Sequence, residues 1–190
     1  MCGQRRVRAC IKRLRRYPLA KKLLVGLGNP GPRYAMTRHN AGFIVVDAFV
    51  DDRGGRFGTH KRTNVDVAEF PDVIVVKPRS MMNLSGGPVK NVASFFKVPP
   101  ADIIVVHDEL DLDLGQVVHK VGGGGNGHNG LRDITKALST PDYQRIRVGI
   151  GRPPGRMAPA KFVLEDFSKR ERDELPIVAA DAADLIATLL

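Results

Sequence analysis

The order of apolar and polar stretches along the chain predicts buried strands that alternate with helices. Short apolar runs at 23–27, 73–76 and 103–106 have the length and the β-branched composition of strands covered on both faces. Residues 40–49 and 88–96 instead repeat their apolar positions every three to four residues, which is typical of helices. This alternation indicates a single α/β domain, with a twisted mixed β-sheet and helices on both of its faces.

Weaker patterns predict the remaining elements. Residues 62–69 alternate loosely and suggest an edge strand, and 116–121 suggest another strand. A helix follows and ends near residue 138. Residues 145–150 alternate basic and apolar side chains, as in a strand with one face in water. The tail from residue 168 onward is expected to be helical.

Composition and cysteine content limit the class of protein. The chain has 190 residues, of which 43% are hydrophobic and 26% charged, as in ordinary globular proteins. No stretch approaches the roughly 20 consecutive apolar residues that a membrane helix needs, so we expect no membrane association. The two cysteines are Cys2 and Cys10. Residues 23–190 therefore contain neither a disulfide framework nor a thiolate metal site, and a cytoplasmic location is expected.

Basic residues are concentrated at the N-terminus. The net charge is +10, but residues 1–22 hold nine of the 30 basic residues and no acidic one. The remaining 21 basic residues nearly balance the 20 acidic ones, so any RNA contact by the domain must come from a local patch. We therefore divide the chain into a basic extension, 1–22, disordered or loosely helical, and one folded domain, 23–190.

The function of the extension is left open by its sequence. An RNA-binding arm, an organelle-targeting peptide and a membrane-surface helix would all have this composition. Residues 1–22 contain no Ser or Thr, which weakens the targeting interpretation. A disordered tail without function is the fourth alternative.

One glycine motif resembles a dinucleotide-binding fingerprint but lacks its mechanism. Residues 26–31 fit the pattern G-x-G-x-x-G after a strand. That fingerprint needs a helix N-terminus whose free N–H groups face a pyrophosphate. Pro30 and Pro32 have no N–H, and no helical pattern begins before about Asn40. NAD or FAD binding is therefore not expected.

Polar side chains of an unusual kind follow the predicted strands: three asparagines, Asn29, Asn83 and Asn129, with His39 and Asp108. Ligands of open α/β sheets bind beyond the carboxyl ends of the strands. Asparagine offers a donor and an acceptor without charge, which suits amide and ester groups. A histidine beside an aspartate suits activation of water, although a single histidine at a strand end can equally be structural.

Five sequence blocks, in order, resemble the bacterial-type peptidyl-tRNA hydrolases. Together they span the chain from about Leu23 to its C-terminus. The blocks are LVGLGNPG at 24–31 with TRHNAG at 37–42, KPRSMMNLSG at 77–86, HDELD at 107–111, GHNGL at 127–131 and RIRVGIGRP at 145–153.

The resemblance implies a catalytic role for three residues and a binding role for six. His39 would activate water, and Asp108 would orient and polarise His39. Asn29 would hold the imidazole or the water in line, or contact the substrate end. Asn83 and Asn129 would bind the peptide backbone, and Tyr34 and Met82 would line the cleft. Lys120 and Arg147 would clamp the 5′-phosphate of a tRNA.

The implied reaction is hydrolysis of the ester between peptide and tRNA, which releases the tRNA for reuse. No cofactor and no protein partner would be needed, and a monomer is expected. The acidic residues beside Asp108 lack the histidine spacing of a zinc site, so no metal is expected. Two rival functions remain: a non-catalytic RNA-binding relative such as an organelle splicing factor, and an esterase for small N-acyl esters. The sequence also departs from the family at Asn126, where Gly or Ala is usual, and in its N-terminal extension.

Overall fold

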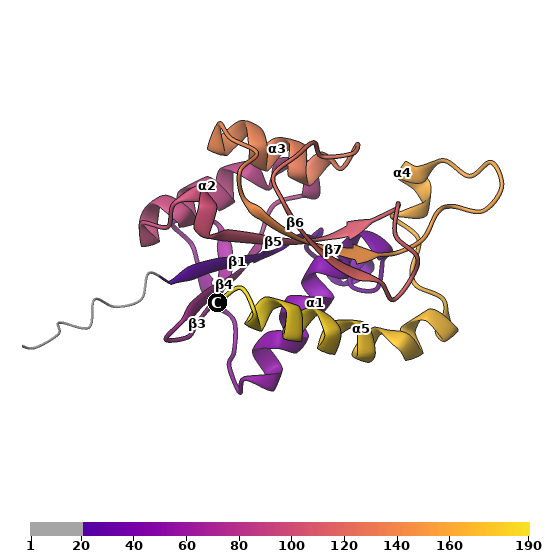
Figure 1. The fold of residues 1–190 in the computed structure, drawn as a ribbon, viewed down its shortest axis with the longest axis horizontal. Coiled ribbons are helices and arrows are strands. Elements are labelled where there is room, and N and C mark those ends of the chain that lie inside the picture. The colour runs from indigo at the N-terminus through magenta and orange to yellow at the C-terminus, as the bar shows by residue number, and fades with distance from the viewer. Residues whose placement is uncertain (1–20) are drawn as a thin grey trace, which may run out of the picture.

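One seven-stranded sheet forms the centre of the computed structural model, which describes residues 21–190. The strand order is β2-β3-β4-β1-β5-β7-β6 (Figure 1). Strands β4, β1, β5 and β7 are parallel to one another, whereas β2, β3 and β6 pair antiparallel. The strands are β1 (Lys22–Gly26), β2 (Gly58–His60), β3 (Val65–Glu69), β4 (Val73–Pro78), β5 (Ile103–Glu109), β6 (Val117–Val121) and β7 (Gln144–Gly149).

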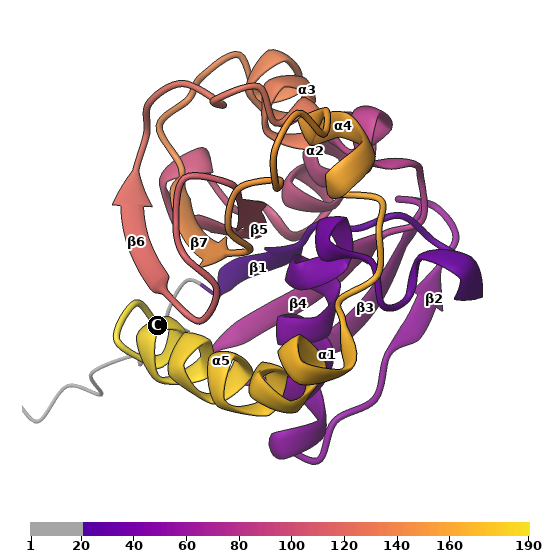
Figure 2. The same ribbon diagram turned by 90° about the vertical axis from the view of Figure 1, so that its right-hand side faces the viewer.

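Helices cover both faces of this sheet, as predicted (Figures 1 and 2). One face carries α1 (Ala41–Asp52) and α5 (Lys169–Ala187), and the other carries α2 (Gly86–Phe96) and α3 (Asn129–Leu138). The short α4 (Pro159–Phe162) precedes α5. Single 3-10 turns complete the set: η1 (Pro32–Tyr34), η2 (Arg38–Asn40), η3 (Met82–Leu84) and η4 (Pro100–Asp102). Among residues 21–190, no helix combines the length and apolarity that a membrane span requires.

The side chains of β1 explain why its sequence is continuously apolar. Leu24 packs in the core beneath α1 and α5, whereas Leu23 and Val25 pack beneath α2 and α3. All three are fully buried, because strands on either side and helices on both faces exclude water. A run without polar residues is the expected signature of such a strand.

Glycines allow α1 to approach β1 and β5 closely. A Cβ on Gly42 would lie 2.3 Å from the carbonyl oxygen of Val106, and one on Gly26 would lie 2.5 Å from Val46 Cγ2. The glycine-rich sequence after β1 therefore serves packing. It leads into the 3-10 turn η1, and the first α-helix, α1, begins only at Ala41.

Two predictions about the sheet are wrong. The predicted edge strand at 62–69 is β3, which starts at Val65 and lies between β2 and β4; the edge is β2, whose three residues carry no apolar side chain. The strand at 145–150 does not have a wet face throughout, because Arg145 is only 2% exposed.

The predicted boundary of the basic extension falls inside an element. Lys22 is the first residue of β1, and its Nζ lies 2.5 Å from Asp102 Oδ1. Lys21 is also described, and its Nζ lies 3.7 Å from Glu69 Oε2. The rest of the predicted extension lies outside the described residues.

Two neighbouring glycines should respond oppositely to alanine. In Gly86→Ala the new Cβ would lie 2.3 Å from the backbone oxygen of Asp133, so we expect a loss of about 1–3 kcal/mol in the free energy of unfolding. In Gly87→Ala the Cβ meets nothing within 4 Å, and helix propensity should make the change neutral or stabilising by up to about 1 kcal/mol. Urea unfolding measures both, and equal effects would contradict this account of the α2–α3 contact.

Candidate active site

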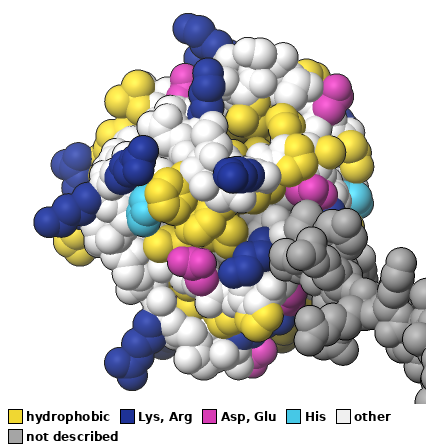
Figure 3. Space-filling view, turned by 90° about the vertical axis from the view of Figure 1, so that its left-hand side faces the viewer, with side chains coloured by type: hydrophobic (Ala, Val, Ile, Leu, Met, Phe, Trp, Pro, Cys, Tyr) yellow, Lys and Arg dark blue, Asp and Glu magenta, His cyan; other side chains and the backbone are white. Residues whose placement is uncertain are grey.

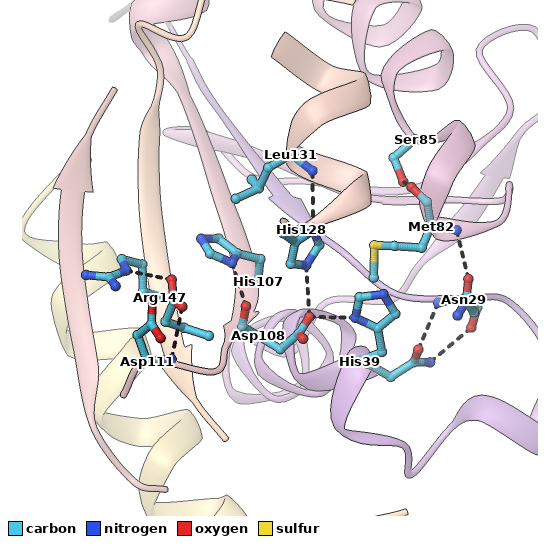
Figure 4. A network of polar contacts seen from close by, with 12 residues as sticks. Asn29, His39, Met82, Ser85, His107, Asp108, Asp111, His128, Leu131 and Arg147 are labelled. Carbon is cyan, nitrogen blue, oxygen red and sulfur yellow. Dashed lines mark hydrogen bonds and ion pairs between the residues drawn. The ribbon is translucent and has the colours of Figure 1, made fainter. Parts of the chain in front are cut away.

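Four segments of the chain meet beyond the carboxyl ends of β1 and β5 (Figure 4). Asn29 follows β1, and His39 lies in the turn η2. Asp108 is near the end of β5, and His128 directly precedes α3. Residues far apart in sequence are thus brought together at the sheet edge where ligands of α/β proteins bind.

The carboxylate of Asp108 is shared by two histidines. Its Oδ1 lies 2.9 Å from Nδ1 of His39 and 2.9 Å from Nε2 of His128. The residue is only 4% exposed. Burial by itself raises the pKa of Asp108, but the two neighbouring imidazoles outweigh it and lower the pKa well below the usual range of a carboxyl. Asp108 is therefore ionised and accepts both hydrogen bonds.

The surrounding hydrogen bonds fix the tautomer of each ring. His128 is the N-cap of α3, and its Nδ1 accepts the backbone N–H of Leu131 at 3.3 Å. Its proton must then be on Nε2, which donates to Asp108. Since an ionised carboxylate only accepts, Nδ1 of His39 also donates to Asp108. In the neutral form of His39 this leaves Nε2 without a proton, as a general base requires.

Asp108 also raises the basicity of His39. Burial lowers the pKa of His39, but the charge of Asp108 and its hydrogen bond raise it more, so the pKa lies above its ordinary value of 6.5. A higher pKa makes the neutral imidazole a stronger base. It also means that the basic form appears only as the pH rises through this higher value.

The cluster has the composition of a metal site but the hydrogen bonding of a proton-transfer site. Ligand atoms of His39, Asp108 and His128 lie within 4.8 Å of one another. Coordination through Nε2 of His128 would move its proton to Nδ1, where it would oppose the N–H of Leu131. The geometry therefore favours the hydrogen-bonded arrangement over a cation.

Asn40 joins the turn of His39 to the loop of Asn29. Its Oδ1 accepts the backbone N–H of Asn29 at 2.8 Å, and its Nδ2 donates to the carbonyl of Asn29 at 3.0 Å. The Oδ1 of Asn29 accepts the backbone N–H of Met82 at 2.8 Å. Within residues 21–190 the Nδ2 of Asn29 has no hydrogen-bond partner, so this donor is available for a ligand.

A cavity of about 490 Å³ opens beside these residues. Its polar side includes His39, Asp108, His128 and Asn129, together with the charged side chains of Glu109, Asp111 and Arg152. Its apolar side includes residues of α4 and Val163, which lie over this edge of the sheet (Figure 2). The cavity thus has one wall of hydrogen-bonding groups and one apolar wall, as small-molecule and peptide sites commonly do.

The predicted catalytic residue Asn29 and the other predicted substrate-binding residues lie outside this cavity. Asn29 lines a neighbouring cavity of about 410 Å³, together with Phe43 and Lys77. Tyr34, Met82 and Asn83 line neither of the two. Met82 is buried and its backbone anchors Asn29, Asn83 is exposed in η3, and the Tyr34 hydroxyl accepts a hydrogen bond from Arg33 at 2.6 Å.

Comparison with known proteins identifies the family of this chain. A family model described as peptidyl-tRNA hydrolase matches residues 23–190. The chain belongs to the peptidyl-tRNA hydrolase family. A peptidyl-tRNA hydrolase of Corynebacterium efficiens is 59% identical over 164 residues, which cover 86% of this chain and 93% of that protein. One of Rhodococcus erythropolis is 55% identical over 172 residues, covering 88% and 90%.

The likeness extends to solved structures. The crystal structure of a peptidyl-tRNA hydrolase of Acinetobacter baumannii superposes with a TM-score of 0.83 at 34% identity, covering 90% of this chain and 89% of that one. The single α/β domain predicted from the sequence is therefore confirmed as the fold of this family.

The two residues of the predicted phosphate clamp lie on the same face of adjacent strands. Lys120 pairs with Arg145 across β6 and β7, so Arg147 is its diagonal neighbour. Lys120 is exposed, whereas Nε of Arg147 lies 2.9 Å from Oε2 of the buried Glu109. Both residues line a small hollow beside the glycine-rich loop.

The glycine-rich loop is fastened by Arg145. This arginine donates to the carbonyls of Gly123 and Gly124 at 2.6 and 2.7 Å, which explains its burial on a strand expected to face water. Asn126, where the family usually has Gly or Ala, has a φ of 46°. Asparagine tolerates this left-handed conformation better than most residues do, so the departure fits the loop.

The sequence motifs did not predict the contacts made by His128, Arg38 and Arg145. His128 caps α3 and also donates directly to Asp108. Its position next to Asn129 in the GHNG motif was the available signal. His107, by contrast, is buried away from the cavity, and burial lowers its pKa to about 3, with His128 contributing.

Replacing Asp108 by Asn should lower the pKa of His39 below 6.5, because burial remains while the carboxylate charge is lost. The measurement is an NMR titration of the His39 imidazole. Asp111→Asn is the control: it removes an equal charge from an exposed carboxylate near the cavity and should leave the pKa of His39 almost unchanged. A His39 that titrates alike in wild type and Asp108→Asn would mean that Asp108 does not set its basicity.

Proposed function

We propose that this chain hydrolyses peptidyl-tRNA, with water activated by His39. The observation that carries the proposal is the shared carboxylate of Asp108, which fixes the His39 tautomer and leaves Nε2 as a base beside the cavity. Membership of the peptidyl-tRNA hydrolase family supplies the substrate.

The reaction proceeds by attack of water on the ester carbonyl. Nε2 of His39 takes a proton from the water while oxygen bonds to the carbonyl carbon, and Asp108 stabilises the imidazolium that forms. The resulting oxyanion is stabilised by neutral donors, the free Nδ2 of Asn29 or the amide of Asn129. Collapse of this intermediate breaks the bond to the ribose oxygen, which takes the proton back from His39.

Asparagine side chains account for a preference for acylated substrates. Asn129 lines the cavity and Asn83 is exposed in η3, so both can bind peptide amides. Tyr34 and Met82 complete the proposed binding set, Met82 through its hold on Asn29. A free aminoacyl-tRNA leaves these groups unpaired and is therefore a poor substrate.

Lys120 and Arg147 are proposed to bind the 5′-phosphate of the tRNA. Their common face lies beside the loop that leads to His128. The end of the molecule where β1 begins has lysines and arginines dispersed among apolar and acidic side chains (Figure 3). A local clamp that measures the acceptor stem by shape, without reading bases, agrees with the near-neutral charge of residues 23–190.

The rival functions are less well supported. A non-catalytic RNA-binding relative would not need an ionised Asp108 that orients two imidazoles. An esterase for small N-acyl esters would not need the clamp face. We further propose that the enzyme acts in the cytoplasm, as a monomer and without a cofactor. The monomer is supported because His39, Asp108 and His128 all come from one chain.

His39→Ala should reduce release of N-acetyl-aminoacyl groups from tRNA by roughly a hundredfold or more, since a general base contributes about that much. Wild type and variant are both assayed with a chelator present. His60→Ala removes a histidine that makes an edge-to-face contact with Phe95 and does not line the cavity, so this control should retain activity. Measurable RNA binding without release by the wild type would favour the non-catalytic relative.

Lys120→Ala should raise KM roughly tenfold, because a charge-assisted hydrogen bond to phosphate is lost. Enzymatic removal of the 5′-phosphate from the tRNA should raise the KM of the wild type similarly, and should add little in Lys120→Ala. Lys90→Ala removes a charge from α2 and should respond to dephosphorylation as the wild type does. Additive effects in Lys120→Ala would place the phosphate elsewhere.

A further inference from the structure

Arg38, the residue before His39, is buried against the C-terminal part of the chain. It is only 7% exposed, and its guanidinium carbon lies 4.3 Å from the ring centroid of Phe162 and 5.6 Å from that of Phe167. A cation is costly to bury, so its partners indicate what it fixes in place.

The guanidinium donates hydrogen bonds to Glu165 and Asp166, which precede α5, and to Glu171 in the first turn of α5. Its Nη1 donates to the carbonyls of Glu165 and Asp166 at 3.3 and 2.9 Å. Its Nη2 donates to both carboxylate oxygens of Glu171, at 3.1 and 2.8 Å. A planar guanidinium can satisfy this set of acceptors, whereas the single ammonium of a lysine cannot.

Glu171 is itself held firmly. It forms a capping box with Ser168: its Oε2 accepts the backbone N–H of Ser168 at 2.6 Å, and Ser168 Oγ accepts that of Glu171 at 3.3 Å. Helix α5 then buries Leu175, Val178, Ala182 and Ile186 in the core beneath the sheet. Arg38 is therefore tied to a helix end that has little freedom to move.

Backbone hydrogen bonds join the same two segments. The N–H of His39 donates to the carbonyl of Val163 at 2.8 Å, and the N–H of Arg38 donates to that of Glu165 at 3.1 Å. Residues 163–167 thus lie directly behind the turn η2. Within that turn, no side chain caps the helix start, so the position of His39 depends on these external contacts.

We propose that Arg38 is a positioning residue for the reaction, which holds the imidazole of His39 against Asp108 by fastening η2 to the N-terminus of α5. This inference rests on the proposed function. Asn40 fastens the turn to the Asn29 loop on one side, and Arg38 fastens it to α5 on the other. Loosening either connection lengthens the bond between Nδ1 of His39 and Asp108.

Three variants test this, with one matched control. Arg38→Lys keeps the charge but loses the bidentate contact, and Arg38→Ala removes both. Glu171→Gln keeps an acceptor for Ser168 but removes the charge that faces Arg38. The control is Arg53→Ala, because Arg53 likewise pairs with a carboxylate, Asp72, and lies over two phenylalanine rings, Phe49 and Phe70, away from the cavity.

Two readouts are compared after stability has been measured by urea unfolding. The first is the NMR-measured pKa of His39 without substrate, and the second is kcat and KM for peptidyl-tRNA. In the Arg38 and Glu171 variants we expect this pKa to fall toward or below 6.5 and kcat to drop about tenfold or more, with KM changed much less. Arg53→Ala should change stability only.

An unchanged pKa of His39 in the Arg38 variants would overturn the proposal, even if kcat fell, because a smaller folded fraction lowers activity without altering that pKa. If Arg38→Ala does not fold, Arg38→Lys and Glu171→Gln decide the question in the same way. A lowered pKa of His39 combined with a wild type that does not cleave peptidyl-tRNA would sink the proposed function while leaving the positioning by Arg38 intact.

Discussion

The buried carboxylate of Asp108, with two imidazoles on one oxygen, is the contact on which the rest of the site depends. A carboxylate that is 4% exposed is unstable unless donors replace the lost water, and here His39 and His128 are those donors. Their hydrogen bonds join β5 to the turn η2 and to the start of α3. The same contact that stabilises a buried charge therefore also fixes the geometry of the proposed base.

Other contacts can be understood as holding the two rings in place. His128 cannot rotate freely because its second nitrogen caps α3, and the turn of His39 is held by Asn40 in front and by residues 163–167 behind. Arg145 serves the loop before His128 in the same manner, through two carbonyls. The amide of Asn129 beside His39 is neutral, so it can bind an ester without competing for the proton.

The sequence allowed the fold to be predicted where burial is complete. The central residues of strands β1 and β4 are apolar because helices cover both faces of the sheet. The start of α5 can be recognised from its capping box, Ser168 and Glu171. The strand β2 has no such pattern, and it was missed. In β7 the alternation of Arg145 and Arg147 resembles a solvated strand, because the loop that covers Arg145 comes from a distant part of the chain.

The candidate site could likewise be predicted from the sequence only in part. Motifs identified His39, Asp108 and Asn129, which line one cavity. The contacts that no local pattern reveals are those between distant segments: His128 binds a carboxylate 20 residues earlier, and Arg38 binds one 133 residues later. Periodicity reports what surrounds a residue on its own element, whereas these partners are set by the order of strands in the sheet.

The central place of β1 has a consequence for how the molecule forms. This strand precedes β4 and β5 in the chain but lies between them, and both of its pairings are parallel and long-range. Such pairings close late in folding because they cost the most loop entropy. During synthesis from the N-terminus, His39 is made early but has no carboxylate partner until Asp108 emerges, and Asp108 lacks its second imidazole until His128 follows. A nascent chain therefore lacks the shared carboxylate of the site until His128 has been made.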